Sequence, residues 1–276
     1  MHWYLGKQSM NKLWITLATL LCLLLLAWQP WESTPSPDAT ERFESNTLSP
    51  VGQAIVDHSL THLVPGGGIE GSTALQVDYQ GYERGSRRVV VSPRIEPALQ
   101  YELSFWVEFC DGFDFARGGK LHGLGPANPV AGGNTITPEG WSARLMFRGD
   151  GGLQTYIYHQ DMAGRYGDTQ RAEGFVFEPG RYYQVRMQVV LNTPASASNG
   201  SVTVWVDDHR LIEHAGLRFR DRESDASHIQ RLLFSTFHGG SSPEWAPRRS
   251  NGSYKTDCAL FDDISVVAHP PDVPQP

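Results

Sequence analysis

The chain has 276 residues, of which 40% are hydrophobic and 19% charged, with 28 glycines and 18 prolines. This composition is typical of a soluble, turn-rich globular protein and argues against a coiled coil or a disordered chain. Beyond residue 31 there are 21 basic and 30 acidic residues, a formal net charge of −9, which argues against a nucleic-acid partner.

The first 31 residues have the pattern of a signal peptide or a membrane anchor. Lys7 and Lys12 precede an uncharged, strongly apolar stretch of sixteen residues at 13–28. This stretch is shorter than the ~20 residues that span a bilayer comfortably, yet no A-x-A-like cleavage site follows, so a cleaved signal and a retained membrane tether both stay open. We predict export: a secreted or periplasmic protein, or one anchored with its domain outside the cytoplasmic membrane.

Residues 32–50 are rich in proline, serine and threonine and are predicted to be a spacer. Residues 51–276 are expected to form a single domain. Short strand-like segments separated by Gly, Pro and Asp dominate it, at residues 75–79, 87–91, 101–109, 141–148, 153–159, 181–191, 201–206, 231–237 and 259–267. This spacing predicts the all-β class: a β-jelly roll, meaning a two-sheet antiparallel sandwich, with a concave substrate groove.

Two cysteines remain after the apolar stretch. Cys110 ends one predicted strand and Cys258 begins another. In an oxidising compartment they can pair, closing a loop of roughly 150 residues that stabilises the fold by up to ~5 kcal/mol. The alternative is a pair of buried free thiols.

Three predicted strands separate polar from apolar side chains. Their odd positions are mostly apolar, whereas their even positions are Ser142, Arg144, Met146 and Arg148, then Gln154, Tyr156, Tyr158 and Gln160, then Gln184, Arg186 and Gln188. A solvated face ordinarily includes Asp and Glu, and these positions include none. We therefore expect one sheet to present a surface suited to an anionic, hydroxyl-rich ligand.

The first two of these strands are joined by Gly149-Asp-Gly-Gly152, a strong hairpin signal. A two-residue loop would mix polar and apolar side chains on both faces. A three-residue loop at 150–152, with a glycine in the left-handed conformation, keeps the faces apart and sets Arg144 opposite Tyr158 and Met146 opposite Tyr156. The second register is therefore predicted.

Upstream, Lys120 lies in a glycine-rich segment, RGGKLHGLG at 117–125. It is one of only two lysines beyond residue 31, where the other 19 basic residues are arginines. Glycine at this density allows close approach of the backbone to a ligand, although a tight surface loop is the simpler alternative. The scarcity of lysine favours the functional interpretation.

Four segments together resemble polysaccharide lyase family 14, which includes alginate and glucuronan lyases. They are GGKLHGL at 118–124, GWSARLMFR at 140–148, TYIY at 155–158 and FSTFHGG at 234–240. The resemblance runs over roughly residues 70–268 and implies a jelly roll whose groove is lined by Lys120, Ser142, Arg144, Tyr156 and Tyr158. His122 stands where relatives commonly have proline, a departure that bears on the shape of the loop and on the choice of substrate.

A polyuronate lyase removes the C5 proton of a uronate and expels the oxygen on C4. Arg144 is predicted to offset the charge of the substrate carboxylate, with Ser142 as an auxiliary donor. The cluster has no Asp or Glu, so the base and the acid must be Tyr or Lys. We favour Tyr158 as base or acid, with its pKa lowered by nearby Arg and Lys, and Lys120 as the second proton-transfer group or a carboxylate neutraliser. Tyr156 is assigned to substrate binding.

Further substrate contacts are predicted at His122, Gln160, Arg186 and His238. No cofactor and no metal are expected: the spacing of HRLIEH at 209–214 fits no zinc motif. The predicted function is an exported lyase that cleaves an acidic polysaccharide of the alginate or glucuronan class. A non-catalytic carbohydrate-binding jelly roll is the main alternative, and an envelope adhesion domain is a third.

Overall fold

The computed structural model describes residues 38–44 and 48–269. The predicted signal or anchor at 1–31 lies outside these residues. Among the described residues, no helix is long and apolar enough to cross a membrane. Export and a membrane tether therefore stay predictions.

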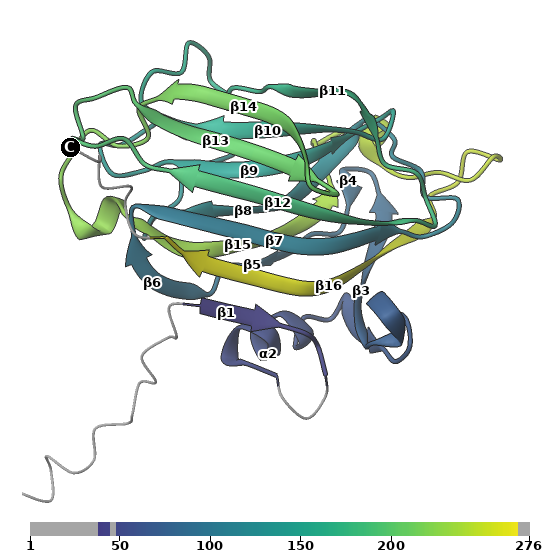
Figure 1. The fold of residues 1–276 in the computed structure, drawn as a ribbon. Coiled ribbons are helices and arrows are strands. Elements are labelled where there is room, and N and C mark those ends of the chain that lie inside the picture. Colours follow the sequence, from purple (N-terminus) through teal and green to yellow (C-terminus); the bar gives the residue numbers. More distant parts are fainter. Residues whose placement is uncertain (1–37, 45–47, 270–276) are drawn as a thin grey trace, which may run out of the picture. The chain divides into compact units, whose positions relative to one another are not determined.

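The domain is built from two antiparallel sheets, which confirms the predicted jelly roll. The larger sheet has the strand order β14 (His209–Leu217), β13 (Gly200–Val206), β12 (Tyr182–Val190), β7 (Gln100–Phe109), β16 (Thr256–Ala268), β3 (Ala74–Tyr82) and β2 (Thr61–Val64), with β1 (Asp38–Glu41) on β16 and β4 (Gly85–Ser86) on β3. The smaller sheet has the order β11 (Arg171–Val176), β10 (Gly152–Tyr158), β9 (Ser142–Arg148), β8 (Gly118–Gly125), β15 (Ile229–His238) and β5 (Val89–Val91), with β6 (Arg94–Ala98) on β15. In Figure 1 strands of the two sheets run in similar directions, as in an aligned sandwich.

Within residues 38–44 and 48–269, helical structure is confined to short segments. One α-helix, α2 (Pro50–Val56), and three 3₁₀ turns, Ile69–Gly71, Asp225–Ser227 and Pro243–Trp245, connect the strands of the described residues. The α-helix begins at Ser49, whose hydroxyl accepts a hydrogen bond from the Gly52 amide. The third 3₁₀ turn matters for function because Trp245 lines two pockets on the smaller sheet.

The domain begins before residue 51, which corrects the predicted boundary of the spacer. β1 pairs with the C-terminal half of β16, with Glu41 opposite Ile264. The buried Glu41 carboxylate accepts hydrogen bonds from the Phe43 and Ser49 amides, and the Phe43 ring is itself fully buried. A segment rich in Pro, Ser and Thr thus contributes an edge strand and part of the core.

All nine predicted strands are present, and the faces of β9 and β10 are as expected. Trp141, Ala143, Leu145 and Phe147 are fully buried between the sheets. The glycine-rich segment around Lys120 forms the central strand β8, so the alternative of a tight surface loop is wrong. Its glycines fit where neighbouring strands approach closely: a Cβ on Gly123 would lie 2.1 Å from the Ala143 carbonyl oxygen.

A disulfide joins Cys110 and Cys258, which are 148 residues apart in sequence. It links the end of β7 to the start of β16, where the Cys110 amide also donates a hydrogen bond to the Cys258 carbonyl. Cross-linking so long a loop restricts the unfolded chain and stabilises the fold by up to ~5 kcal/mol.

His122 lies in the core between the sheets, so its predicted contact with substrate is wrong. Its ring stacks on Phe234 at 4.1 Å and packs against Phe105 and Phe261. Neither ring nitrogen has a hydrogen-bond partner, and burial lowers the pKa of His122 to about 3. The imidazole is therefore neutral at physiological pH, and its two polar atoms destabilise the core.

Replacing His122 with leucine is expected to stabilise the protein, because it removes two unsatisfied polar atoms at similar volume. The gain should be about 1 kcal/mol after allowing for the lost aromatic stacking. Thermal unfolding should show Tm rising by roughly 2–4 °C for a domain of this size. A fall in Tm of that size would mean that the ring nitrogens are satisfied.

Candidate active site

A cleft of about 920 Å³ lies on the outer face of the smaller sheet, which packs its other face against the core. The side chains of β8, β9, β10 and β15 form its floor, and loops form its walls. It brings together Lys120, Arg144 and Tyr156. The remaining lining is Arg88, Val90, Ala131, Gly132, Met146, Arg148, Gln154, Tyr166, Gly167, Thr169, Ser235, Phe237, Gly239, Gly240, Ser241, Ser242 and Trp245.

The hairpin between β9 and β10 has a three-residue loop, as predicted, but the loop lies one residue earlier. Residues 149–151 form it, so Arg144 pairs with Tyr156 and Ser142 with Tyr158, and the predicted register is wrong by two residues. Gly151 has φ +80° and its amide donates to the Arg148 carbonyl. Because a shift of two residues preserves the alternation, the predicted cluster still shares one face.

A β-bulge places Lys120 on the floor of the cleft. Lys120 pairs with Met146 and Gly123 with Arg144, so β8 has one residue more than β9 in this interval. Leu121 and His122 both lie on the core side as a result. The bulge lets Lys120 and Gly123 share one face of the sheet although they are three positions apart in the sequence.

The Lys120 ammonium group lacks a carboxylate partner. Its Nζ donates to the Met146 Sδ at 3.2 Å and lies 3.2 Å from the centroid of the Tyr156 ring. Among the described residues Lys120 forms no ion pair. Burial, followed by the positive charges of the arginines at 144, 148 and 88, holds the pKa of Lys120 well below its usual value. A lowered pKa makes the neutral amine, which can accept a proton, more accessible than it is for an exposed lysine.

Arg144 is held in place by Ser142. Its Nη1 donates to the Ser142 Oγ at 2.8 Å, and that buried hydroxyl donates to the Val130 carbonyl at 2.6 Å. Burial lowers the pKa of Arg144 to about 10, and the nearby tyrosines oppose the shift. Arg144 is therefore cationic at neutral pH, and Ser142 positions it.

Tyr156 and Tyr158 form a chain of hydroxyl groups. Tyr156 lines the cleft, whereas Tyr158 is fully buried and its hydroxyl accepts a hydrogen bond from the Gly133 amide at 2.8 Å. The two hydroxyl oxygens are 3.2 Å apart. With Gly133 donating to Tyr158, the Tyr158 proton can point to Tyr156 and the Tyr156 proton to the cleft.

The acidity of Tyr156, which the sequence assigned to substrate binding, is set mainly by its burial. Burial, followed by its hydrogen bond to Tyr158, raises the pKa of Tyr156 above its usual value. Desolvation of the phenolate is the largest cause, and only an interaction with the Gly167 backbone opposes it. Tyr156 stays protonated near neutral pH and is suited to donate a proton.

Comparison with known proteins identifies the family. The family model for polysaccharide lyase 14 matches residues 74–258, more than half of the chain. The chain belongs to polysaccharide lyase family 14. None of the curated protein sequences compared with the chain matches it.

Solved structures of polysaccharide lyases share this fold. Alginate lyase Aly36B is 21% identical, with a TM-score of 0.67, over 84% of this chain and 97% of its own. The PL-14 alginate lyase of Aplysia kurodai is 20% identical, with a TM-score of 0.65, over 84% and 98%. The endo-β-1,4-glucuronan lyase of Trichoderma reesei is 14% identical, with a TM-score of 0.56, over 86% and 96%.

Three other predicted substrate contacts lie away from the cleft of this family 14 domain. His238 is fully buried, stacks on Phe113 and uses its Nε2 to donate to the Asp114 carbonyl, so its role is structural. Gln160 lies beyond the end of β10, where its amide donates to two carbonyl groups in a separate pocket of about 260 Å³. Arg186 belongs to the larger sheet, over the Trp205 ring and 3.6 Å from Glu102.

Other residues also line the cleft. The alternation placed Met146, Arg148 and Gln154 on the polar face, but the sequence interpretation assigned them no role in the site. Arg88 and Trp245 come from segments far away in the chain. No local pattern places them beside Lys120.

Proposed function

We propose that this protein cleaves a polyuronate of the alginate or glucuronan class by β-elimination in the cleft. Membership of polysaccharide lyase family 14 supports the reaction class, and the names of the structural relatives support the substrate class. The observation that carries the proposal is a lysine that forms no ion pair among the described residues, lies over the Tyr156 ring and shares the cleft with Arg144.

The uronate carboxylate opposes loss of the neighbouring C5 proton because the developing carbanion adds negative charge. The Arg144 guanidinium binds this carboxylate and stabilises the enolate-like state. Ser142 keeps the guanidinium in place. One such electrostatic contact typically contributes ~10²–10³ in turnover.

The proton transfers follow from the opposite shifts of Lys120 and Tyr156. The neutral Lys120 amine takes the C5 proton, and the C–H electron pair becomes the C4=C5 double bond. The bond from C4 to the glycosidic oxygen breaks, and the Tyr156 hydroxyl protonates that leaving oxygen. Tyr158 then supplies hydrogen bonding to the Tyr156 oxygen. This assignment differs from the sequence-based preference for Tyr158 because Tyr156 faces the cleft.

The pH profile of kcat/KM tests the role of Lys120. Activity should rise as pH increases through the lowered pKa of Lys120, since the neutral amine is the base. Arg88→Gln removes a positive charge that disfavours the lysine cation, so the pKa of Lys120 should rise and the acid limb should move to higher pH. Arg210→Gln, on β14 of the other sheet, is the control. A shift to lower pH would contradict the assignment.

Export is part of the proposal. The Cys110–Cys258 disulfide supports an oxidising compartment, as does the apolar sequence at 13–28. Fractionation of the source cells should find the domain outside the cytoplasm, and soluble full-length protein in the cytoplasm would contradict export.

The direct test of function is to incubate the purified full chain with alginate, glucuronan and a neutral glucan. Ultraviolet absorbance of the conjugated double bond should increase with a polyuronate and stay constant with the glucan. Binding of a polyuronate without an unsaturated product would favour the carbohydrate-binding alternative.

A further inference from the structure

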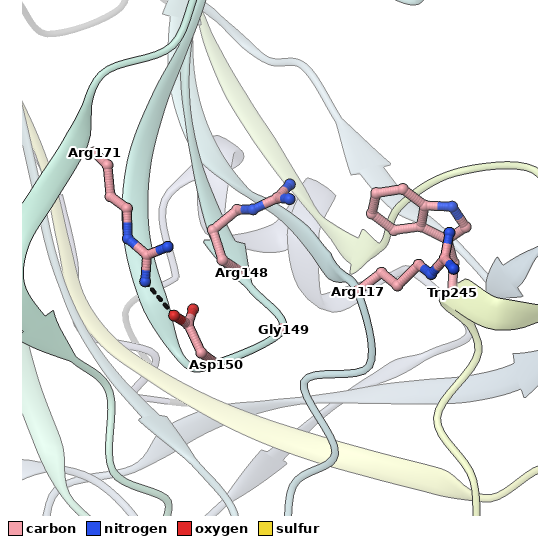
Figure 2. Close-up of a pocket in the computed structure, with 6 residues that line it drawn as sticks. All are labelled: Arg117, Arg148, Gly149, Asp150, Arg171 and Trp245. Atoms are coloured by element: carbon pink, nitrogen blue, oxygen red, sulfur yellow. Dashed lines mark hydrogen bonds and ion pairs between the residues drawn. The ribbon is translucent and has the colours of Figure 1, made fainter.

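A second pocket, of about 480 Å³, adjoins the cleft at the turn between β9 and β10 (Figure 2). It is lined by Arg117, Arg148, Gly149, Asp150, Arg171 and Trp245. Arg148 and Trp245 also line the cleft, so the two hollows are adjacent. None of the catalytic assignments above involves Arg117 or Arg171.

The pocket contains an excess of positive charge. Three guanidinium groups face one carboxylate, that of Asp150, which is paired with Arg171. Figure 2 shows Arg148 between this pair and Arg117. Within the part of the chain that the structure describes, Arg117 and Arg148 make no side-chain hydrogen bond or ion pair. Two cations thus remain available to an anion.

The backbone places these arginines beside one another. Gly118 pairs with Arg148 across β8 and β9 and has φ +114°. A Cβ at Gly118 would lie 2.6 Å from the Phe147 carbonyl oxygen. Only glycine fits this close approach in this conformation, and it brings the segment with Arg117 next to the hairpin.

We propose that this pocket is a distal subsite that binds the carboxylate of a uronate unit remote from the cleaved bond. Arg144 and Arg148 are four residues apart on β9, which corresponds to about 13 Å along a strand. This span exceeds one sugar ring, so the two arginines contact carboxylates of different units. Guanidinium groups suit carboxylates, and the Trp245 ring offers an apolar surface to the sugar. The inference rests on the proposed polyuronate substrate.

The test compares short and long uronate oligomers. Equilibrium affinity for a disaccharide and an octasaccharide is measured in a Lys120→Arg background, where slow turnover is expected. Adding Arg117→Gln and Arg171→Gln together should weaken octasaccharide binding roughly tenfold and leave the disaccharide unchanged. Arg210→Gln, which removes one arginine charge on the other sheet, serves as a control.

Asp150→Asn should act in the opposite direction. It removes the negative charge and releases Arg171, while the amide oxygen still accepts the hydrogen bond from the Gly152 amide. Octasaccharide binding should therefore tighten. Equal effects on both oligomers, no effect of the double substitution, or weaker binding by Asp150→Asn would each overturn the subsite.

The outcome separates the subsite from the lyase activity. If the unsubstituted protein cleaves polyuronates but the arginine substitutions do not weaken octasaccharide binding, the subsite is wrong and the lyase stands. If the unsubstituted protein forms no unsaturated product but octasaccharide binding depends on Arg117 and Arg171, the lyase proposal fails and the subsite stands.

Discussion

Replacing Lys120 with arginine is expected to lower kcat by ~10²–10⁴, the usual contribution of a general base. Arginine keeps a long polar side chain in the cleft, but it holds its proton and cannot accept the C5 hydrogen at working pH. Lys120→Met, which keeps an unbranched apolar stem beside Met146 and Tyr156, should lose a similar factor. Initial rates of unsaturated product formation provide the measurement.

These two variants distinguish a base from a neutraliser of the substrate carboxylate. A neutraliser would be replaced adequately by arginine, so high activity of Lys120→Arg together with low activity of Lys120→Met would contradict the proposed base. Lys255→Arg is the matched control, because Lys255 is paired with Asp257 outside the cleft. It should retain nearly all activity.

The second large effect is expected at the tyrosine pair. Tyr156→Phe keeps the ring beneath Lys120 and removes only the hydroxyl that protonates the leaving oxygen, so kcat should fall by ~10²–10⁴ with a smaller change in KM. Tyr158→Phe removes the hydrogen-bond partner of that hydroxyl and should cost roughly tenfold. Steady-state kinetics of both variants on one polyuronate provide the measurement.

The relative size of the two losses decides which tyrosine is the acid. A larger loss in Tyr158→Phe than in Tyr156→Phe would contradict the assignment from the cleft and favour the one made from sequence. Thermal unfolding of both variants is the control, since Tyr158 is buried and accepts the Gly133 amide. A loss of activity at unchanged Tm would mean that the missing hydroxyl affects the reaction and not the stability of the fold.

The strands were predictable because a strand that buries one face has apolar and polar residues in alternation along its own sequence. β9 and β10 show this most clearly, and their faces hold even though the register is displaced by two residues. The alternation within a strand does not show which of the two sheets the strand joins. Arg186 alternates as Arg144 does, yet β12 pairs with β7 and β13 in the larger sheet, so the two arginines belong to different surfaces.

The site was partly predictable for the same reason. Lys120, Arg144 and Tyr156 meet in the cleft as expected, since scarce lysine and a polar face without acids are visible in the sequence. The orientation of His122 was not, because an extra residue in β8 turns it to the core. The burial of Tyr158 was not predictable either, because its hydroxyl is bonded by the backbone amide of Gly133, a residue on another segment.

Mass spectrometry of the products from a polyuronate oligomer of defined length tests the central claim most directly. β-Elimination adds no water, so the masses of the two fragments should sum to that of the substrate, with one fragment lighter by a water than its saturated counterpart. The Lys120→Arg variant should form these fragments far more slowly. Fragments whose masses sum to substrate plus one water would show hydrolysis and contradict the account.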